Sequence, residues 1–220
     1  MKKILVINPN SNEAVTEGIR ESTGPLQIPA MVEIECVTLS EGPFGIESRL
    51  DSESVVLPLH RMVTQRQDAD AYVIACYSDP GLALCREATN KPVYGIQESG
   101  LFAALQRGAR VGVVALGLAS IKRHLPYIRA LGLESRLAAE RPLHMWVAES
   151  EEASAYPRIE AVARTLVEQD NADTLLMGCA GLARHCTKLE QALGVPVTEP
   201  TQAAVAQALG SVLLGVNAEP

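Results

Sequence analysis

The sequence lacks the features that would tie it to a membrane or to nucleic acid. No apolar run approaches the roughly 18 residues needed to cross a bilayer, and the N-terminal run is only ILVI, with no small-residue cleavage site after it. Lysine and arginine do not cluster, and 19 basic against 26 acidic residues leave a net charge of −7. We therefore expect a soluble, cytoplasmic protein with no membrane or nucleic-acid partner.

The motifs of disulfide frameworks, metal sites and nucleotide sites are missing too. The five cysteines are odd in number and form no CxxC pair, which argues against a disulfide scaffold and a zinc knuckle. The four histidines show neither HxxxH nor HExxH spacing. The glycines of GPFGIES do not form GxGxxG, and GxxxxGK[ST] is absent. The sequence thus predicts reduced thiols, no metal and no nucleotide.

What the chain does contain is an alternation of short apolar runs with longer amphipathic segments. KILVINP precedes SNEAVTEGIREST, AYVIACY precedes GLALCREATN, and in the second half RVGVVALG precedes SIKRHLPYIRALG. Such alternation is typical of an α/β protein with a mainly parallel sheet. A chain of 220 residues can form one large domain or two lobes of about 100 residues each.

An internal repeat favours two lobes. DAYVIAC runs from Asp70 to Cys76, and DTLLMGC runs from Asp173 to Cys179, so both have an acidic residue, five strand-like residues and a cysteine. The offset between the two cysteines is 179 − 76 = 103 residues. KKILVINPNSN at the N-terminus has a counterpart in ARVGVVALGLAS, where an apolar strand again leads into a turn and a helix. Repetition of this kind indicates two related units.

We predict two pseudo-symmetric α/β lobes, each a mainly parallel sheet flanked by helices. Residues 1–97 form the first lobe, residues 98–200 form the second, and a C-terminal helix over residues 201–220 packs back on the first. Ligands of open α/β sheets bind beyond the carboxyl ends of the strands. Cys76 and Cys179 are therefore predicted to lie on opposite walls of an active-site cleft between the lobes.

Two opposed thiols suit the inversion of a carbon atom, because a thiolate can remove a proton from one face while a thiol delivers one to the other. A helix that begins just after a cysteine lowers the pKa of the thiol toward neutrality. We expect Ser78 or Asp79 to cap such a helix, with Pro80 in its first position. After the second cysteine, the amides of Ala180 and Gly181 are placed to hold an enolate-like oxygen.

The motifs ACYSDPGL and MGCAGL, together with INPNSN and EGPFGIES, resemble the hydantoin and allantoin racemases of the aspartate/glutamate racemase superfamily over nearly the whole chain. The resemblance implies a cofactor-independent, metal-independent racemase with Cys76 and Cys179 as catalytic residues. We also expect a homo-oligomer that acts on a small molecule. The predicted substrate-binding residues, which include the amides after each cysteine, are Asn10, Gly45, Ile46, Tyr77, Ser78, Gly117, Leu118, Ala119, Ala180 and Gly181.

The stretch ALGLAS departs from the amino-acid racemases of the superfamily, which usually carry threonines there and after their cysteines to hold a carboxylate. Gly-Leu-Ala favours a neutral or cyclic carbonyl substrate, and it predicts a pocket with no arginine or lysine placed to pair with a substrate carboxylate. A maleate cis-trans isomerase, an amino-acid racemase and a non-catalytic small-molecule sensor remain open. Arylmalonate decarboxylases keep only the second cysteine, so the presence of both argues against that activity. A redox dithiol needs cysteines close enough for a disulfide, whereas catalytic thiols are expected to lie too far apart.

The other cysteines have structural interpretations. Cys36 alternates within a strand and Cys85 falls in the helix after the first cysteine motif, so both are expected in the core. Cys186 is expected to pack in the same way. His185 stands near Cys179 in the sequence, but a position on the helix surface is the simpler expectation.

Overall fold

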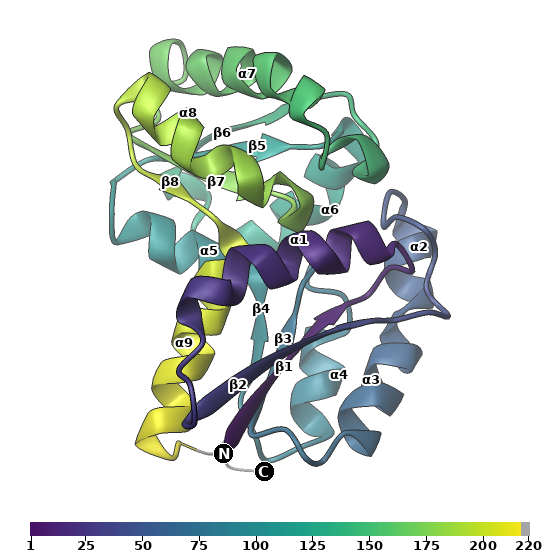
Figure 1. Cartoon of the computed structure of the whole chain (residues 1–220). Coiled ribbons are helices and arrows are strands. Elements are labelled where there is room, and N and C mark those ends of the chain that lie inside the picture. Colours follow the sequence, from purple (N-terminus) through teal and green to yellow (C-terminus); the bar gives the residue numbers. More distant parts are fainter. Residues whose placement is uncertain (217–220) are drawn as a thin grey trace.

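Two four-stranded sheets, one in each half of the chain, organise the computed structural model, which describes residues 1–216 (Figure 1). All strand pairs within both sheets are parallel. The first sheet has the order β2-β1-β3-β4 and consists of β1 (Lys2–Asn8), β2 (Val32–Thr38), β3 (Ala71–Ile74) and β4 (Val93–Gly95). The second has the order β6-β5-β7-β8 and consists of β5 (Val111–Ala115), β6 (Leu137–Pro142), β7 (Thr174–Gly178) and β8 (Val197–Thr198). The two halves therefore share one topology.

Ten longer helical segments cover these sheets in the described part of the chain. The first half of the chain contains α1 (Glu13–Thr23), α2 (Arg49–Ser54), α3 (Val56–Gln65), α4 (Leu82–Glu87) and α5 (Ile96–Leu105). The second contains α6 (Leu118–Ala130), α7 (Tyr156–Glu168), the 3-10 helix η5 (Ala180–His185), α8 (Cys186–Leu193) and α9 (Pro200–Leu214). The shorter 3-10 turns are η1 (Gly24–Leu26), η2 (Glu134–Arg136), η3 (Val147–Glu149) and η4 (Ala153–Ala155).

Side chains of β1 alternate between two cores, because successive residues of a strand point to opposite faces of a sheet. Leu5 and Ile7 pack into a smaller core with the helical residues Leu59 and Val63. Ile4 and its neighbours on the same face join a larger core that continues into the second half. All five side chains have no exposed surface, and full burial of one such side chain contributes about 1.5–3 kcal/mol.

The aspartates of the internal repeat hold the base of each sheet. Asp70 accepts a hydrogen bond from the backbone amide of Lys3 at 2.8 Å, and Asp173 accepts one from the amide of Arg110 at 2.8 Å. In both halves the carboxylate thus joins the start of the third strand to the start of the first. The repeated acidic residue aligns the two central strands, at the end of the sheet opposite the cysteines.

The helix that follows the fourth strand crosses to the other half in both cases (Figure 1). β4 leads into α5, which packs on β7, and β8 leads into α9, which packs on β1, β3 and β4. The crossing helices approach closely at Gly100, where an added Cβ would lie 2.8 Å from Leu176 and 3.0 Å from Pro200. The lobe boundaries at residues 97 and 200 stay a prediction, and residues 217–220 of the predicted last helix lie outside the described residues.

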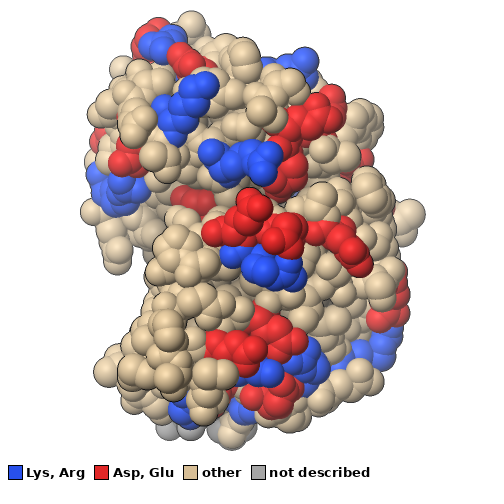
Figure 2. Space-filling view, in the orientation of Figure 1, with Lys and Arg blue, Asp and Glu red and all other residues tan. Residues whose placement is uncertain are grey.

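Charged side chains of opposite sign lie next to each other on the face drawn in Figure 2. Among the ion pairs of the described residues, the Lys3 ammonium nitrogen lies 2.9 Å from Asp68 and 3.0 Å from Glu35, and Arg66 pairs with the same two carboxylates. None of the helices in residues 1–216 is long and apolar enough to cross a membrane.

Candidate active site

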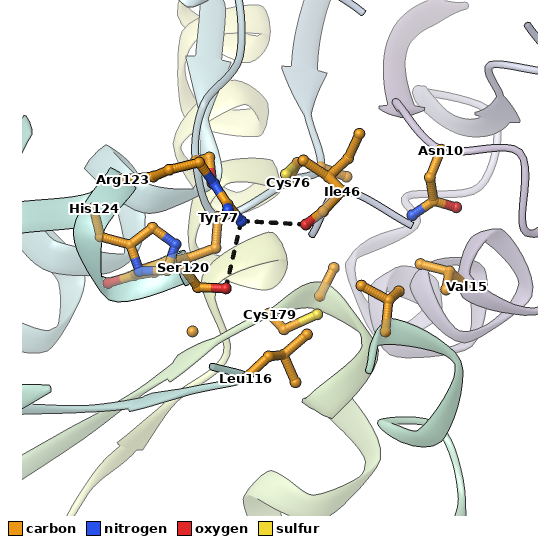
Figure 3. A pocket seen from close by; sticks show the side chains of 15 residues that line it. Asn10, Val15, Ile46, Cys76, Tyr77, Leu116, Ser120, Arg123, His124 and Cys179 are labelled. Atoms are coloured by element: carbon orange, nitrogen blue, oxygen red, sulfur yellow. Dashed lines mark hydrogen bonds between the residues drawn. The ribbon is translucent and has the colours of Figure 1, made fainter. Parts of the chain in front are cut away.

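A narrow cavity lies at the carboxyl ends of β3 and β7, where the two halves meet (Figure 3). Cys76 is the second residue after β3, Cys179 is the first residue after β7, and both line the cavity. Because β3 and β7 occupy the same position in their sheets, equivalent loops bring one thiol each to a shared space. The cavity has a volume of about 30 Å³, which is room for one or two water molecules.

The loop after Cys76 is held by Asp79. The Asp79 amide donates to the Cys76 carbonyl at 2.9 Å, and its buried carboxylate accepts from the amides of Gln97 and Glu98 at 2.9 Å each, at the start of α5. Burial raises the pKa of Asp79 to about 7, although these amide hydrogen bonds act in the opposite direction. The prediction that Ser78 or Asp79 caps the next helix is wrong: α4 is capped at Gly81, and Asp79 caps α5 instead.

The expected lowering of the thiol pKa values toward neutrality is wrong as well. Burial raises the pKa of Cys76 to about 11, and the backbone amide of Ser78 and the charge of Arg123 offset only part of that rise. Burial likewise raises the pKa of Cys179 to about 12. The helix dipoles contribute little, since α4 begins only at Leu82 and η5 is a short 3-10 segment.

The hydroxyl of Ser150 lies near Cys179, and no sequence motif predicted this contact. The Gly181 amide and the nearby Ser150 hydroxyl, which donates to the Val147 carbonyl at 2.7 Å, favour the thiolate of Cys179. The charges of Cys76 and Glu151 disfavour it. Ser150 is fully buried, and an added Cβ on Gly181 would lie 2.2 Å from its Oγ. The absence of a side chain at Gly181 therefore lets Ser150 approach.

His185 supports the same loop from behind. Its Nε2 lies 3.2 Å from the carbonyl oxygen of Ser150, and the residue is 4% exposed. The expectation of a histidine on the helix surface is wrong, because η5 turns this ring inward. Burial lowers the pKa of His185, which favours the neutral ring.

The INPNSN segment presents one amide to the cavity. Asn8 is fully buried and donates to Asn10 Oδ1 at 3.0 Å and to Thr16 at 3.0 Å, and the Asn12 amide donates to Asn10 Oδ1 at 2.9 Å. With its oxygen held in this way, the Asn10 side chain turns its nitrogen to the cavity side (Figure 3). Asn10 can thus donate to a carbonyl oxygen, while Asn8 organises the loop.

Helix α6 of the second half contributes three further residues to the cavity, at the spacing i, i+3 and i+4 that places them on one face. These are Ser120, Arg123 and His124. The His124 ring packs edge-on against Tyr77 with centroids 4.8 Å apart, and its Nδ1 lies 3.0 Å from Glu140 Oε1. The side chains of His124 and Glu140 are each 2% exposed, so the ring that packs against Tyr77 is itself buried and held by a hydrogen bond.

Arg123 lines the cavity, and the prediction of a pocket with no arginine or lysine placed to pair with a substrate carboxylate stays a prediction. The Arg123 guanidinium donates to Ser78 Oγ at 3.3 Å, to the Glu47 carbonyl at 2.8 Å, to the Ile46 carbonyl at 3.3 Å and to Ser120 Oγ at 3.4 Å. Arg123 lies one helical turn beyond the ALGLAS stretch from which the prediction was made. Because most of its five N–H groups are engaged by neutral oxygens, Arg123 is held in place rather than free to clamp a carboxylate.

A second, wider cavity of about 330 Å³ adjoins the first and shares Ile46, Leu116 and Ser120 with it. The predicted residues Gly117, Leu118 and Ala119 line this space, not the narrow cavity. Its remaining walls are Glu47, His144, Met145 and Trp146. Leu118 and Trp146 are 58% and 66% exposed, which leaves an apolar surface open beside the thiols.

The structure brings most of the predicted residues to the narrow cavity, namely Asn10, Ile46, Cys76, Tyr77, Ser78, Cys179 and Ala180. Gly45 and Gly181 line neither cavity: an added Cβ on Gly45 would meet Val147, and the one on Gly181 would meet Ser150. Cys36 and Cys85 are buried as expected. Within residues 1–216, no group of three or more His, Cys, Asp or Glu side chains is arranged to hold a metal ion.

Comparison with known proteins places this chain in a family. The family model described as Asp/Glu/Hydantoin racemase matches residues 4–208. The chain belongs to this family. It is 36% identical over 218 residues to the hydantoin racemase of Pseudomonas sp. (strain NS671), and the aligned region covers 97% of this chain and 87% of that protein. It is 32% identical over 219 residues to the hydantoin racemase of Paenarthrobacter aurescens, with coverage of 97% and 92%.

The solved structure of allantoin racemase from Klebsiella pneumoniae matches with a TM-score of 0.94 at 26% identity, covering 100% of this chain and 91% of that chain. The predicted α/β fold with two parallel sheets is thereby confirmed. The resemblance read from the cysteine motifs is confirmed too, and the protein is a racemase-type isomerase of the Asp/Glu racemase superfamily.

Proposed function

We propose that this racemase inverts a carbon next to a carbonyl in a hydantoin-like substrate, with Cys76 and Cys179 as the two proton carriers. The observation that carries the proposal is the pair of thiols, supplied by equivalent strands of two sheets, in one cavity. Proton transfer to opposite faces of one carbon requires this arrangement. A sensor that only binds a ligand would need neither thiol.

Each turnover conserves protons. One cysteine, as thiolate, takes the hydrogen from the reacting carbon and becomes a thiol, while the electron pair of the C–H bond moves into an enolate. The opposite thiol then protonates the carbon from the other face and becomes the thiolate. The product is the mirror image of the substrate at that carbon, and the enzyme is ready for the reverse direction.

Three donors support the enolate oxygen in this proposal. The amides of Tyr77 and Ala180 have no hydrogen-bond partner within residues 1–216, and the Asn10 side chain turns its nitrogen to the same cavity. Donors fixed in advance stabilise developing negative charge more than mobile water does. A neutral cyclic substrate suits these donors, since Arg123 is already engaged by four oxygens.

Solvent deuterium tests the proposal. A single enantiomer of a 5-substituted hydantoin, incubated in deuterated water with the protein, is expected to gain deuterium at the reacting carbon as it inverts. Polarimetry and proton NMR report the two events. Prior treatment with a chelator is expected to leave both rates unchanged. Activity that chelation abolishes and a divalent ion restores would overturn the two-thiol mechanism.

The wider cavity is proposed to hold the substituent of the ring. Leu118, Met145 and Trp146 offer an apolar surface next to the thiols, which favours an aromatic or large aliphatic group over a ureido group. The backbone amide of Trp146 donates to the Glu149 carboxylate at 2.7 Å, so this wall of the cavity is anchored.

Trp146→Ala is expected to raise KM for 5-benzylhydantoin by about three- to tenfold, because one aromatic contact contributes about 0.5–1.5 kcal/mol. The KM for allantoin is expected to change less. Initial rates over a range of each substrate measure the effect. Leu57→Ala is the matched control, since Leu57 is 63% exposed on α3 and lines neither cavity. An equal change for both substrates would place the substituent elsewhere.

A further inference from the structure

The two halves break their symmetry in the charge that they present to the cysteine loops. Gly18 is the sixth residue of α1, and Arg123 is the sixth residue of α6, the corresponding helix of the second half. Each helix follows the first strand of its sheet and contacts the opposite half. Arg123 therefore stands beside the loop of Cys76, whereas its counterpart beside the loop of Cys179 has no side chain.

The space in front of Gly18 holds a carboxylate. An added Cβ on Gly18 would lie 2.8 Å from Oε1 of Glu151, and one on Gly181 would lie 3.2 Å from the same atom. This oxygen is buried without a hydrogen-bond partner in the described residues, and the nearest cation, Arg184, is 3.8 Å from the other oxygen. A negative group thus stands on the side of Cys179.

The charge of Arg123 is directed to Cys76. All four of its hydrogen bonds go to uncharged oxygens, while the carboxylates of Asp51 and Glu47 act on its charge without a hydrogen bond to it. One of them goes to Ser78, whose amide and hydroxyl also favour the Cys76 thiolate. The charged neighbours of this sulfur are Arg123, which favours the thiolate, and Asp79, whose carboxylate is engaged by two amides of α5.

The charged neighbours of Cys179 act in the other direction. Glu151 and an ionised Cys76 both disfavour a second thiolate there, and the Ser150 hydroxyl and Gly181 amide offset this only in part. Burial raises the pKa of Glu151 to about 7; Arg184 opposes that rise, and Glu21 and Glu199 add to it, so the carboxylate is fully charged only in alkaline solution.

We propose that Cys76 ionises before Cys179 in the free enzyme, and that Arg123, a positioning residue supplied by the opposite half, sets this order. The inference rests on the proposed function in assigning both thiols to proton transfer. The order in which the two thiols ionise is nevertheless a property of the protein without substrate. Catalysis in the free enzyme then begins with the enantiomer whose hydrogen faces Cys76.

Alkylation by iodoacetamide, followed for each cysteine by peptide mass spectrometry across pH, tests this order. Only the thiolate reacts, so the pH midpoint reports ionisation while differences in access change the rate alone. Cys76 is expected to have the lower midpoint. Arg123→Gln is expected to slow Cys76 alkylation about tenfold at a fixed pH below the midpoint, equivalent to one pKa unit. Arg123→Lys is expected to restore most of that loss, because it keeps the charge.

Two further variants complete the test. Glu151→Gln is expected to move the midpoint of Cys179, and not of Cys76, to lower pH. Arg164→Gln removes an arginine charge from α7, where it pairs with Glu160 and Glu168, and is expected to move neither midpoint. Earlier ionisation of Cys179, or an unchanged Cys76 midpoint in a folded Arg123→Gln protein, would overturn the inference. Because no substrate is present, a failure to racemise hydantoins would leave this result unaffected.

Discussion

Cys179→Ser is expected to abolish racemisation while leaving hydrogen exchange of one enantiomer. A serine hydroxyl is a far weaker acid than a thiol, so the carbanion formed by Cys76 returns its proton to the same face. One positioned proton carrier contributes about 10²- to 10⁴-fold to the rate, and the loss of inversion is expected in that range. Cys76→Ser is expected to abolish inversion equally, and to spare exchange of the opposite enantiomer or of neither. Proton NMR in deuterated water, combined with polarimetry, separates exchange from inversion.

Cys36→Ser is the matched control for both variants. Cys36 is 8% exposed, and its sulfur lies 3.8 Å from the Thr23 hydroxyl, so a serine finds a partner at the same position. Activity close to that of the unmodified protein is expected. A folded Cys36→Ser protein as inactive as Cys179→Ser would show that the pair has been assigned wrongly.

Asp79→Ala is expected to lower the free energy of unfolding by about 2–4 kcal/mol. The buried amides of Gln97 and Glu98 lose their acceptors, and each unsatisfied buried donor costs about 1–3 kcal/mol. The loop that carries Cys76 loses its tie to α5 at the same time, so activity is expected to fall well before the protein unfolds. Urea denaturation followed by circular dichroism measures the first effect, and initial rates measure the second.

Asp79→Asn separates the cap from the charge. It keeps one oxygen acceptor and is expected to lose less stability than Asp79→Ala. Glu53→Ala, which removes an exposed carboxylate paired with Arg49 on α2, is expected to change stability by no more than about 0.5 kcal/mol. An Asp79→Ala protein as stable as the Glu53→Ala protein would show that the hydrogen bonds of Asp79 to α5 do not stabilise this loop.

The fold was predictable wherever a strand is fully buried. The apolar runs ILVI, AYVI and VGVVA lie within β1, β3 and β5. β6, with the sequence LAAERP, was missed because it is an edge strand with every residue half-buried and carries charges. α2 and α3 were not predicted, because the glycines and proline before them indicate a loop and only Leu59 and Val63 of α3 are buried.

The site was predictable to the extent that it repeats. The internal repeat pointed to both cysteines, since each follows the equivalent strand. Ser150 and Glu151 belong to a segment between β6 and α7 that has no counterpart motif, and only the folded chain brings them to Cys179. The predicted helix caps failed because Asp79 found its amide partners 18 and 19 residues away on α5, instead of on the next helix.

The exchange of α5 and α9 between the halves has a mechanical consequence. The two thiols lie in a narrow cavity between the halves, so any movement of one half relative to the other changes the space between them. The chain passes from one half to the other at two places, and the two crossing helices touch at Gly100 and Pro200. Hinges consist of a few loop or element-terminal residues, which here are those at the starts of α5 and α9. Movement of the halves about these two adjacent connections is expected to change the separation of the two sulfurs.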